Sequence, residues 1–344
     1  MTQKKNTLPL LLQVGMTGLM LIFLITDTSA QLPSAFDLFK SDSVMHIRLT
    51  TDLKLLVKQK DEEIYQPATI EIQRLGDTII HEVQIRARGN IRKEVCYYPP
   101  IRIKFSGDDY SHNKIKWVNA CRDTEAYDQM LLKEYMAYRI FSSLTHKSFQ
   151  TYLLQVEYVD SGRDNESFLQ HAFVIEPEDH LAERLGGRVH EPRFLKEDYM
   201  DLEQLALFSM FEYMIANTDW AFANRHNMEI VTSPETNTLL TIPYDFDYSG
   251  FVHPPYAVPH ETVPIDDVSE RHNKSYCMTE EMCDFTRNYM LERKDTVLAA
   301  CQAVPHLTKR TTNFTMSFVE DFFKIIQSER SARRIFVRDC NQMD

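Results

Sequence analysis

The sequence lacks the features that mark several common classes of protein. It has no CxxC and no HxxxH spacing, which argues against a zinc-type cluster. Its formal charge of −12 leaves no basic footprint of the kind that a nucleic-acid partner needs. No stretch after residue 30 is apolar enough to cross a membrane, so we expect no membrane span in the mature chain. Internal repeats and low-complexity tracts are also absent.

The first 30 residues have the pattern of a secretory signal peptide. A basic pair at Lys4 and Lys5 precedes a mostly apolar segment over 8–25. The small residues at 28–30 then provide a cleavage site before Gln31. We therefore expect export to the periplasm, the cell surface or the medium, with cleavage near Ala30-Gln31. An uncleaved leader would instead tether the chain to a membrane.

Six cysteines are consistent with export, because an oxidising compartment would allow three disulfides. The sequence leaves their pairing open. They are Cys96, Cys121, Cys277, Cys283, Cys301 and Cys340.

The remaining chain reads as an α+β protein with a strand-rich half and a mainly helical half. We expect a linker over 31–43, an N-terminal β-rich lobe over 44–176 and a C-terminal helical lobe over 177–344. Alternating apolar and polar residues predict an antiparallel sheet of about five strands with one helix over 128–144. Expected strands include 45–49, 68–72, 78–88, 101–105, 151–159 and 168–175, and closing helices are expected over 280–303 and 317–335.

Residues 201–250 contain the candidate site. A strongly apolar helix is followed by a polar loop over 219–227, a hairpin over 228–244 and an acidic loop that starts at Asp245. Carboxylate and amide oxygens would thus fall on two loops beside one hairpin, an arrangement that can hold Mg²⁺ against a phosphate. The structural alternative is that these side chains only cap loops and form turns.

Six motifs in this order resemble those of the spore-coat CotH kinase family and, more distantly, of HipA-type kinases. They are RARGN at 86–90, RIKF at 102–105, LLKEYMAYRIF at 131–141, FVIEPED at 173–179, NTDWAFANRHN at 217–227 and PYDFD at 243–247. The last two are the specific ones. The resemblance implies a two-lobed protein-kinase-like fold and a phosphotransferase that uses ATP or another nucleotide with Mg²⁺ or Mn²⁺. The acceptor would carry a hydroxyl group, as on a protein Ser or Thr, for example in an envelope protein.

The resemblance implies nucleotide-binding roles for residues of the first four motifs. Lys104 would pair with the phosphates, and Glu134 would hold that lysine. Arg88, next to Gly89, would lie in a turn that covers the phosphates, although the chain has no GxGxxG loop. Glu176 would fall at the connection between the lobes, where adenine docks through backbone hydrogen bonds. The structural alternatives are a solvated strand lysine and an ordinary helix ion pair.

Catalysis and metal binding would fall to the last two motifs. Asp219 would orient or deprotonate the acceptor hydroxyl. Asn227, which abuts the next strand, or Asn224, which has the offset seen in ordinary protein kinases, would bind the metal. Asp245 would bind it too, and Asp247 would share it or take the second role. The acidic turn is Asp-Phe-Asp rather than Asp-Phe-Gly, and no HRD triplet precedes the loop.

Two other functions fit the same residues. One is a non-catalytic protein that binds a partner in the cell envelope. The other is a hydrolase that uses Asp219 and Asp245 as a pair of carboxyl groups about 5 to 10 Å apart across a cleft. Binding of nucleotide and metal, together with a need for Asp219, distinguishes the kinase from the binding protein, and dependence on a nucleotide distinguishes it from the hydrolase.

Overall fold

The computed structural model of the protein describes residues 1–2, 32–74, 76–191, 195, 199–233 and 235–341. Residues Leu32–Asp344 form one unit, and Met1–Gln31 form another. The expected signal peptide, apart from its first two residues, and its cleavage site lie outside the described residues. Within the described residues, no helix has the length and apolar character needed to span a membrane.

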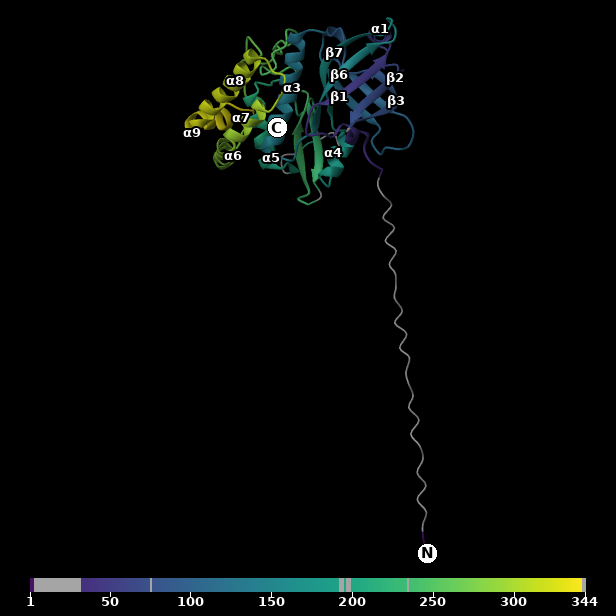
Figure 1. Ribbon diagram of the computed structural model, residues 1–344. Helices are drawn as coiled ribbons and strands as arrows, with labels where there is room; N and C mark the ends of the chain where they lie inside the picture. Colours follow the sequence, from purple (N-terminus) through teal and green to yellow (C-terminus); the bar gives the residue numbers. More distant parts are fainter. Residues whose placement is uncertain (3–31, 75, 192–194, 196–198, 234, 342–344) are drawn as a thin grey trace. The chain divides into compact units, whose positions relative to one another are not determined.

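Seven strands close into a barrel in the order β1-β2-β3-β4-β5-β7-β6 (Figure 1). β1 pairs with β6 in parallel, from Met45 opposite Leu154 to Thr51 opposite Asp160. The other neighbouring strands pair antiparallel. The strands are β1 (Met45–Thr51), β2 (Gln66–Arg74), β3 (Asp77–Ala87), β4 (Ile101–Phe105), β5 (Lys114–Asn119), β6 (Thr151–Asp160) and β7 (Glu166–Ile175).

This closure corrects the fold class expected from the sequence. The open antiparallel sheet of a kinase-like N-terminal lobe is wrong, whereas the mixed α+β content is confirmed. Alternation along a strand reports which face is buried, but it does not report which strand lies alongside. The parallel pairing joins strands that are about a hundred residues apart, so no local pattern in the sequence could indicate it.

The barrel interior is filled by apolar residues that alternate with polar ones along the strands, such as Ile85, Ile103 and Trp117. The segment expected to be a linker contributes to this core. It contains the 3₁₀ helix η1 (Ala35–Phe39), whose Phe36 and Phe39 are fully buried in the barrel. η1 forms because the Ser34 hydroxyl caps its start and the Asp37 carboxylate accepts a hydrogen bond from the Ser34 backbone N–H.

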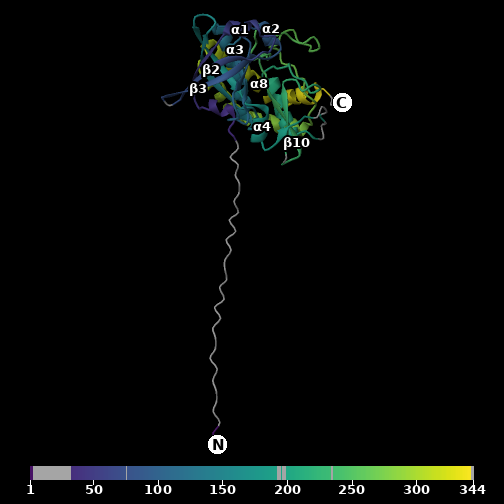
Figure 2. The same ribbon diagram turned by 90° about the vertical axis from the view of Figure 1, so that its right-hand side faces the viewer.

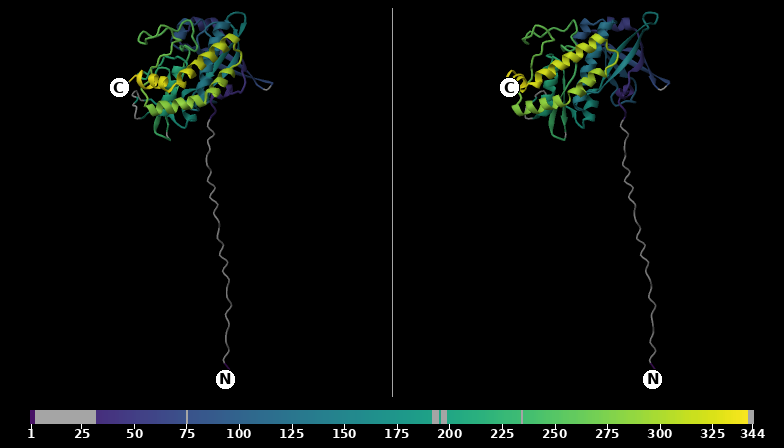
Figure 3. Two further views of the ribbon diagram at one scale, coloured as in Figure 1. Left: turned by 90° about the vertical axis from the view of Figure 1, so that its left-hand side faces the viewer. Right: turned by 60° about the vertical axis from the view of Figure 1, so that its left-hand side comes forward.

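A second core lies between the outer surface of β5, β6 and β7 and a layer of helices. Helix α3 (Glu125–Leu144) lies between the barrel strands and the C-terminal helices (Figures 1 and 3). The C-terminal elements are α6 (Glu280–Glu292), α7 (Lys294–Gln302), α8 (Lys309–Gln327), α9 (Glu329–Arg333) and the π-helical turn η3 (Arg334–Arg338). The single helix expected over 280–303 is therefore divided at Arg293, where the backbone leaves the helical conformation.

A small sheet of order β10-β9-β8 carries the two loops of the candidate site. Its strands are β8 (Arg188–Val189), β9 (Met228–Ser233) and β10 (Thr238–Pro243), and β9 with β10 form the expected hairpin. The hairpin packs beside α5 (Leu202–Met214), the apolar helix before the polar loop, and α4 (Glu178–Arg184) follows the barrel. Near the top of Figure 2, α1 (Leu53–Lys58) and α2 (Ile91–Val95) lie at one end of the unit.

Two disulfides join Cys96 to Cys121 and Cys277 to Cys340. Cys283 and Cys301 are unbridged and buried in α6 and α7. The chain thus uses four of its six cysteines in disulfides.

Candidate functional site

The polar loop after α5 holds Asp219 in a fixed position. The backbone N–H of Asp219 donates to Asn217 Oδ1 at 3.0 Å. Asn227 Nδ2 donates to the Asp219 carbonyl at 2.6 Å and to Asp219 Oδ2 at 3.0 Å, and His226 Nε2 lies 3.2 Å from Asp219 Oδ1. The side chain of Asp219 is still 38% exposed, so a substrate can reach a carboxylate whose direction is already set.

Several residues of this region have positive φ angles, although none is glycine. The values are 51° for Ala216, 52° for Arg225, 55° for Asn227 and 64° for Asp245. Each costs on the order of 1 kcal/mol or more relative to an ordinary backbone, and such residues often lie at functional sites. Here the left-handed turns bring Asn227 back onto Asp219 and direct the chain into the acidic loop.

The acidic loop is anchored to α3. The backbone N–H of Asp245 donates to Tyr138 Oη at 2.9 Å. Phe246 is fully buried, with its ring centre 4.6 Å from that of Tyr138 and 5.4 Å from that of Phe211. Asp247 is buried as well, and its Oδ2 accepts from Tyr256 Oη at 3.0 Å. The central aromatic residue of the Asp-Phe-Asp motif thus holds the two carboxylates that flank it.

Electrostatics within the site reflect this crowding of carboxylates. Burial raises the pKa of Asp247 to about 6, the negative charge of Asp245 adds to the effect, and the nearby Arg92 opposes it. Burial likewise raises the pKa of Glu134, against the opposing effect of Arg92. The charge of Asp219 also acts on Asp247, so the two loops share one electrostatic environment.

Glu134 is held by an arginine that the sequence analysis did not single out. Arg92 lies on α2, and its Nη1 donates to Glu134 Oε2 at 2.9 Å. Its Nη2 donates to the Asn119 carbonyl at 2.9 Å, and its Nε lies 3.8 Å from Asp247 Oδ2. A small pocket beside this cluster is lined by Arg92, Glu134, Asp247, Tyr256 and several apolar residues.

Lys104, expected to contact the phosphates, lies on the exposed side of β4 opposite Lys114 of β5. The lysine at the site is Lys116, which is buried, pairs with Glu178 at the start of α4 and lies 4.9 Å from the centre of the Tyr244 ring. Burial lowers the pKa of Lys116, Glu178 opposes this, and the charge of Asp245 also acts on it. Both lysines alternate with apolar residues, so they differ in what packs against them: α4 and Tyr244 lie against Lys116.

The other expected residues include Arg88, Asn224 and Glu176, and they differ in how close they lie to the site. Arg88 acts electrostatically on Lys116 and Tyr244, so it lies beside the site. Asn224 is exposed within the turn that joins Ala221 to His226, whereas Asn227 contacts Asp219. The side chain of Glu176 is fully buried.

The carboxylate of Glu176 is surrounded by protein donors. It accepts from the Gln150 backbone N–H at 3.0 Å, from Arg184 Nε and Nη2 at 2.8 Å each, and from His180 Nδ1 at 2.9 Å. Both oxygens are therefore occupied by contacts that join the end of β7 to α4. The side chain has a structural use at the place where the resemblance implies an adenine contact.

Lys274 is a further residue that the sequence analysis missed. Its Nζ donates to the carbonyls of Thr218 and Trp220 at 2.6 Å each, so it holds the backbone on both sides of Asp219. Beneath this loop, burial raises the pKa of Glu212 well above its usual range. A lysine more than fifty residues from the loop carries no sequence signal that links it to Asp219.

A divalent cation such as Mg²⁺ is held by carboxylate, carbonyl and amide oxygens. Within the described part of the chain, no three His, Cys, Asp or Glu side chains converge as a metal-binding set. The candidate set is mixed: the carboxylates of Asp245 and Asp247 lie on the acidic loop, and Asn227 lies next to that loop, since its carbonyl accepts from the Tyr244 backbone N–H at 3.2 Å. Since Asn227 turns its Nδ2 to Asp219, its Oδ1 stays available, and all three ligands would be the oxygens that Mg²⁺ or Mn²⁺ prefers.

Comparisons with known proteins find weak structural neighbours, one of which is a kinase. The Helicobacter pylori proinflammatory kinase CtkA aligns with a TM-score of 0.38 and 10% identity over 67% of this chain and 90% of that chain. The open conformation of CtTel1 aligns with a TM-score of 0.29 and 11% identity over 83% of this chain and 13% of that chain. No protein-family model and no curated protein matches the chain. At this level of likeness, the function must be argued from the geometry of the site.

Proposed function

We propose that this chain is an exported, metal-dependent phosphotransferase that moves a phosphoryl group from a nucleotide to a hydroxyl acceptor. The observation that carries the proposal is the arrangement around Asp219. This exposed carboxylate is fixed by Asn227 and His226 and shares an electrostatic environment with the acidic loop. Phosphoryl transfer needs little else from a protein than positioning and charge stabilisation.

Asp219 would accept the proton of the acceptor hydroxyl. The hydroxyl oxygen forms a bond to the terminal phosphorus, and the bond between that phosphorus and the bridging oxygen of the nucleotide breaks. Asn227 keeps the carboxylate pointed at the acceptor, because it holds both the backbone and the side chain of Asp219. Lys274 keeps the surrounding loop in place.

Lys116 and Arg88 are the cations assigned to the nucleotide phosphates. Lys116 is buried and lies within the electrostatic reach of Asp245, whereas Lys104 faces solvent on β4. A compact ammonium in a partly dehydrated site interacts strongly with phosphate oxygens. Its present partner, Glu178, would keep it oriented in the absence of nucleotide.

Asp245, Asp247 and Asn227 would hold the divalent cation. When bound, Mg²⁺ or Mn²⁺ would neutralise the charge on the transferred group and on the departing phosphate. The anchoring of Phe246 keeps the two carboxylates in place before any ligand arrives. This preorganisation is what electrostatic stabilisation of a transition state requires.

Export remains part of the proposal, and the two disulfides in the described residues support it. Structural disulfides persist in oxidising compartments and are rare in the cytosol. The acceptor would be a protein Ser or Thr, or another hydroxyl-bearing molecule, encountered in that compartment.

The test measures both ligand binding and transfer. With ATP and Mg²⁺ or Mn²⁺, the thermal midpoint of the parent should rise, because a ligand that binds only the folded state stabilises it. Asp245→Asn should lose the metal-dependent rise. Asp219→Asn should keep it, while the rate of transfer to an acceptor falls by about 10² to 10⁴.

Two results would count against the proposal. No rise in the midpoint at millimolar nucleotide with either metal would exclude the nucleotide site. A metal-dependent rise without transfer to any protein or small hydroxyl acceptor would favour a non-catalytic binding protein instead.

A further inference from the structure

Arg92 lies on a helix that is too short to be stable without outside support. α2 has 5 residues, and the side chain of its N-cap residue, Asn90, makes no capping hydrogen bond. A single helical turn fixes several backbone angles for very few hydrogen bonds, so isolated helices of this length do not form. The position of Arg92 must therefore come from contacts outside α2.

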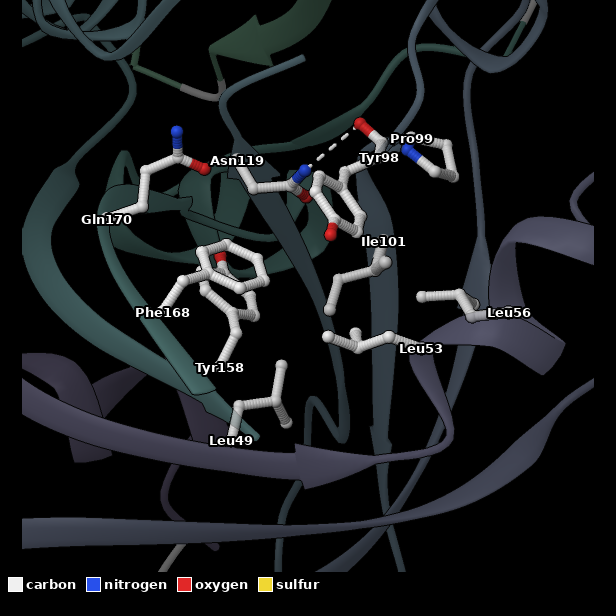
Figure 4. Close-up of a pocket in the computed structure, with 10 residues that line it drawn as sticks. All are labelled: Leu49, Leu53, Leu56, Tyr98, Pro99, Ile101, Asn119, Tyr158, Phe168 and Gln170. Atoms are coloured by element: carbon white, nitrogen blue, oxygen red, sulfur yellow. Dashed lines mark hydrogen bonds between the residues drawn. The ribbon is translucent and has the colours of Figure 1, made fainter. Parts of the chain in front are cut away.

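These contacts gather at the C-terminal end of α2. Its C-cap residue, Cys96, forms the disulfide with Cys121, just beyond the end of β5. The backbone N–H of Tyr98 donates to the Cys121 carbonyl at 3.1 Å, and Asn119 Nδ2 donates to the Tyr98 carbonyl at 3.2 Å (Figure 4). Lys60 Nζ also donates to the Cys96 carbonyl at 3.2 Å. The disulfide is thus the covalent member of a set of contacts that holds α2 against β5.

The guanidinium that α2 supplies is the only salt-bridge partner of two buried carboxylates in the described part of the chain. Arg92 pairs with Glu134 on α3 and with Asp247 in the acidic loop, and it is 9% exposed. Without Arg92, the carboxylate of Asp247 would be a buried charge without a cation beside Asp245, and Glu134 would lose its hydrogen-bond partner. Uncompensated buried charges are strongly unfavourable, so the acidic loop would move to reach water.

We propose that Arg92 is a positioning residue for the acidic loop, and that the Cys96–Cys121 disulfide is the covalent tether that keeps it there. The role of Arg92 in transfer rests on the function proposed above. Reduction by a dithiol breaks the S–S bond and forms two S–H groups, while the dithiol is oxidised to its own disulfide. α2 then loses its covalent attachment, Arg92 leaves Glu134 and Asp247, and the acidic loop loses its alignment.

The first experiment assigns the redox effect to one disulfide. Hydrogen exchange at the amides of residues 245–252 is measured, with and without a dithiol, in the parent and in two variants. In the parent and in Cys277→Ser/Cys340→Ser, reduction should speed exchange at least tenfold. In Cys96→Ser/Cys121→Ser, exchange should be fast from the start and unaffected by the dithiol. Equal exchange in all samples would overturn the tether.

The second experiment tests the arginine directly. Arg92→Met should speed the same exchange at least tenfold and lower kcat at least tenfold, with less than a threefold change in nucleotide affinity measured without metal. Arg48→Met is the control, because it removes an exposed ion pair to Glu157 between β1 and β6 and should change neither quantity. If Arg92→Met does not fold, Arg92→Lys keeps the charge but loses the planar fork, and should show the same two effects more weakly.

The two proposals fail in different ways. A parent that neither binds nucleotide nor transfers a phosphoryl group refutes the proposed function, and the exchange measurements still decide whether the disulfide holds the loop. If the parent is active, and neither reduction nor Arg92→Met changes kcat or the rate of hydrogen exchange, the role of Arg92 is refuted.

Discussion

Glu176→Gln is the substitution that best separates a structural role from a nucleotide-binding role. The carboxylate of Glu176 is fully buried and accepts from Gln150, His180 and twice from Arg184. The glutamine side chain has the same shape as glutamate but no charge, and its NH₂ group would face groups that are themselves hydrogen-bond donors. Breaking a buried ion pair by changing one partner costs about 3–5 kcal/mol.

The expected change in the thermal midpoint follows from the size of the folded unit. At about 2.1 cal/mol/K per residue, a unit of about 310 residues has an unfolding entropy near 0.65 kcal/mol/K. A loss of about 4 kcal/mol should therefore lower the midpoint by about 6 °C, measured by calorimetry. Glu203→Gln, at an exposed position in the first turn of α5, should lower it by less than about 1 °C.

The nucleotide affinity of Glu176→Gln tests the alternative, that this side chain binds the nucleotide. Because both oxygens of Glu176 are already bonded within the protein, the Kd for ATP should change by less than about threefold in Glu176→Gln, in contrast to the midpoint. An unchanged midpoint together with a tenfold weaker Kd would show that the side chain serves the nucleotide, and the structural reasoning would be wrong.

Three further predictions concern the site. Lys116→Met should weaken nucleotide binding about tenfold by isothermal calorimetry, because it removes a buried cation, whereas Lys104→Met should change it less than about threefold; equal effects would contradict the assignment. The raised pKa of Asp247 means that the folded state binds this proton more tightly than the unfolded chain does, so this residue should cost stability as the pH rises from about 4 to about 6, with no further change above. The free energy of unfolding, measured in urea, should therefore rise in Asp247→Asn relative to the parent across that range. If the two proteins show the same dependence on pH, the raised pKa of Asp247 is refuted. Lys274→Met removes two charge-assisted hydrogen bonds to the loop around Asp219, so it should lower the free energy of unfolding by about 3 kcal/mol and lower kcat at least tenfold; an unchanged kcat in the folded variant would show that the loop holds itself.

The local structure was accessible to sequence reasoning where one segment determines its own conformation. The alternation in β3 and β4, the apolar α5 and the hairpin of β9 and β10 all follow from short-range patterns. Asp219, Asn227 and the acidic loop could be located because they directly flank those elements. The sequence could not predict which elements lie side by side, and the parallel pairing of β1 with β6 is the clearest example.

The residues that were missed share one property: a distant segment gives each its environment. Lys116 and Lys104 occupy similar positions on neighbouring strands, and α4 and Tyr244 pack only against Lys116 among these two. Arg92 reaches Glu134 from α2, whose C-cap residue Cys96 is bonded to Cys121, and the sequence left the pairing of the cysteines open. Lys274 reaches the loop around Asp219 from the segment that precedes α6.

The closed barrel also determines how this protein can meet other proteins. Every strand in it has hydrogen-bonded neighbours on both sides, so the barrel offers no free strand edge. A peptide or a second copy of the chain therefore cannot extend that sheet by adding a strand, which is a common route to recognition and also to aggregation. In the small sheet, β8 has only 2 residues, and the residues next to β10 include Met200, which already bridges to Leu239. At the barrel, a protein partner would thus have to be recognised by side chains and by the shape of the surface rather than by backbone pairing.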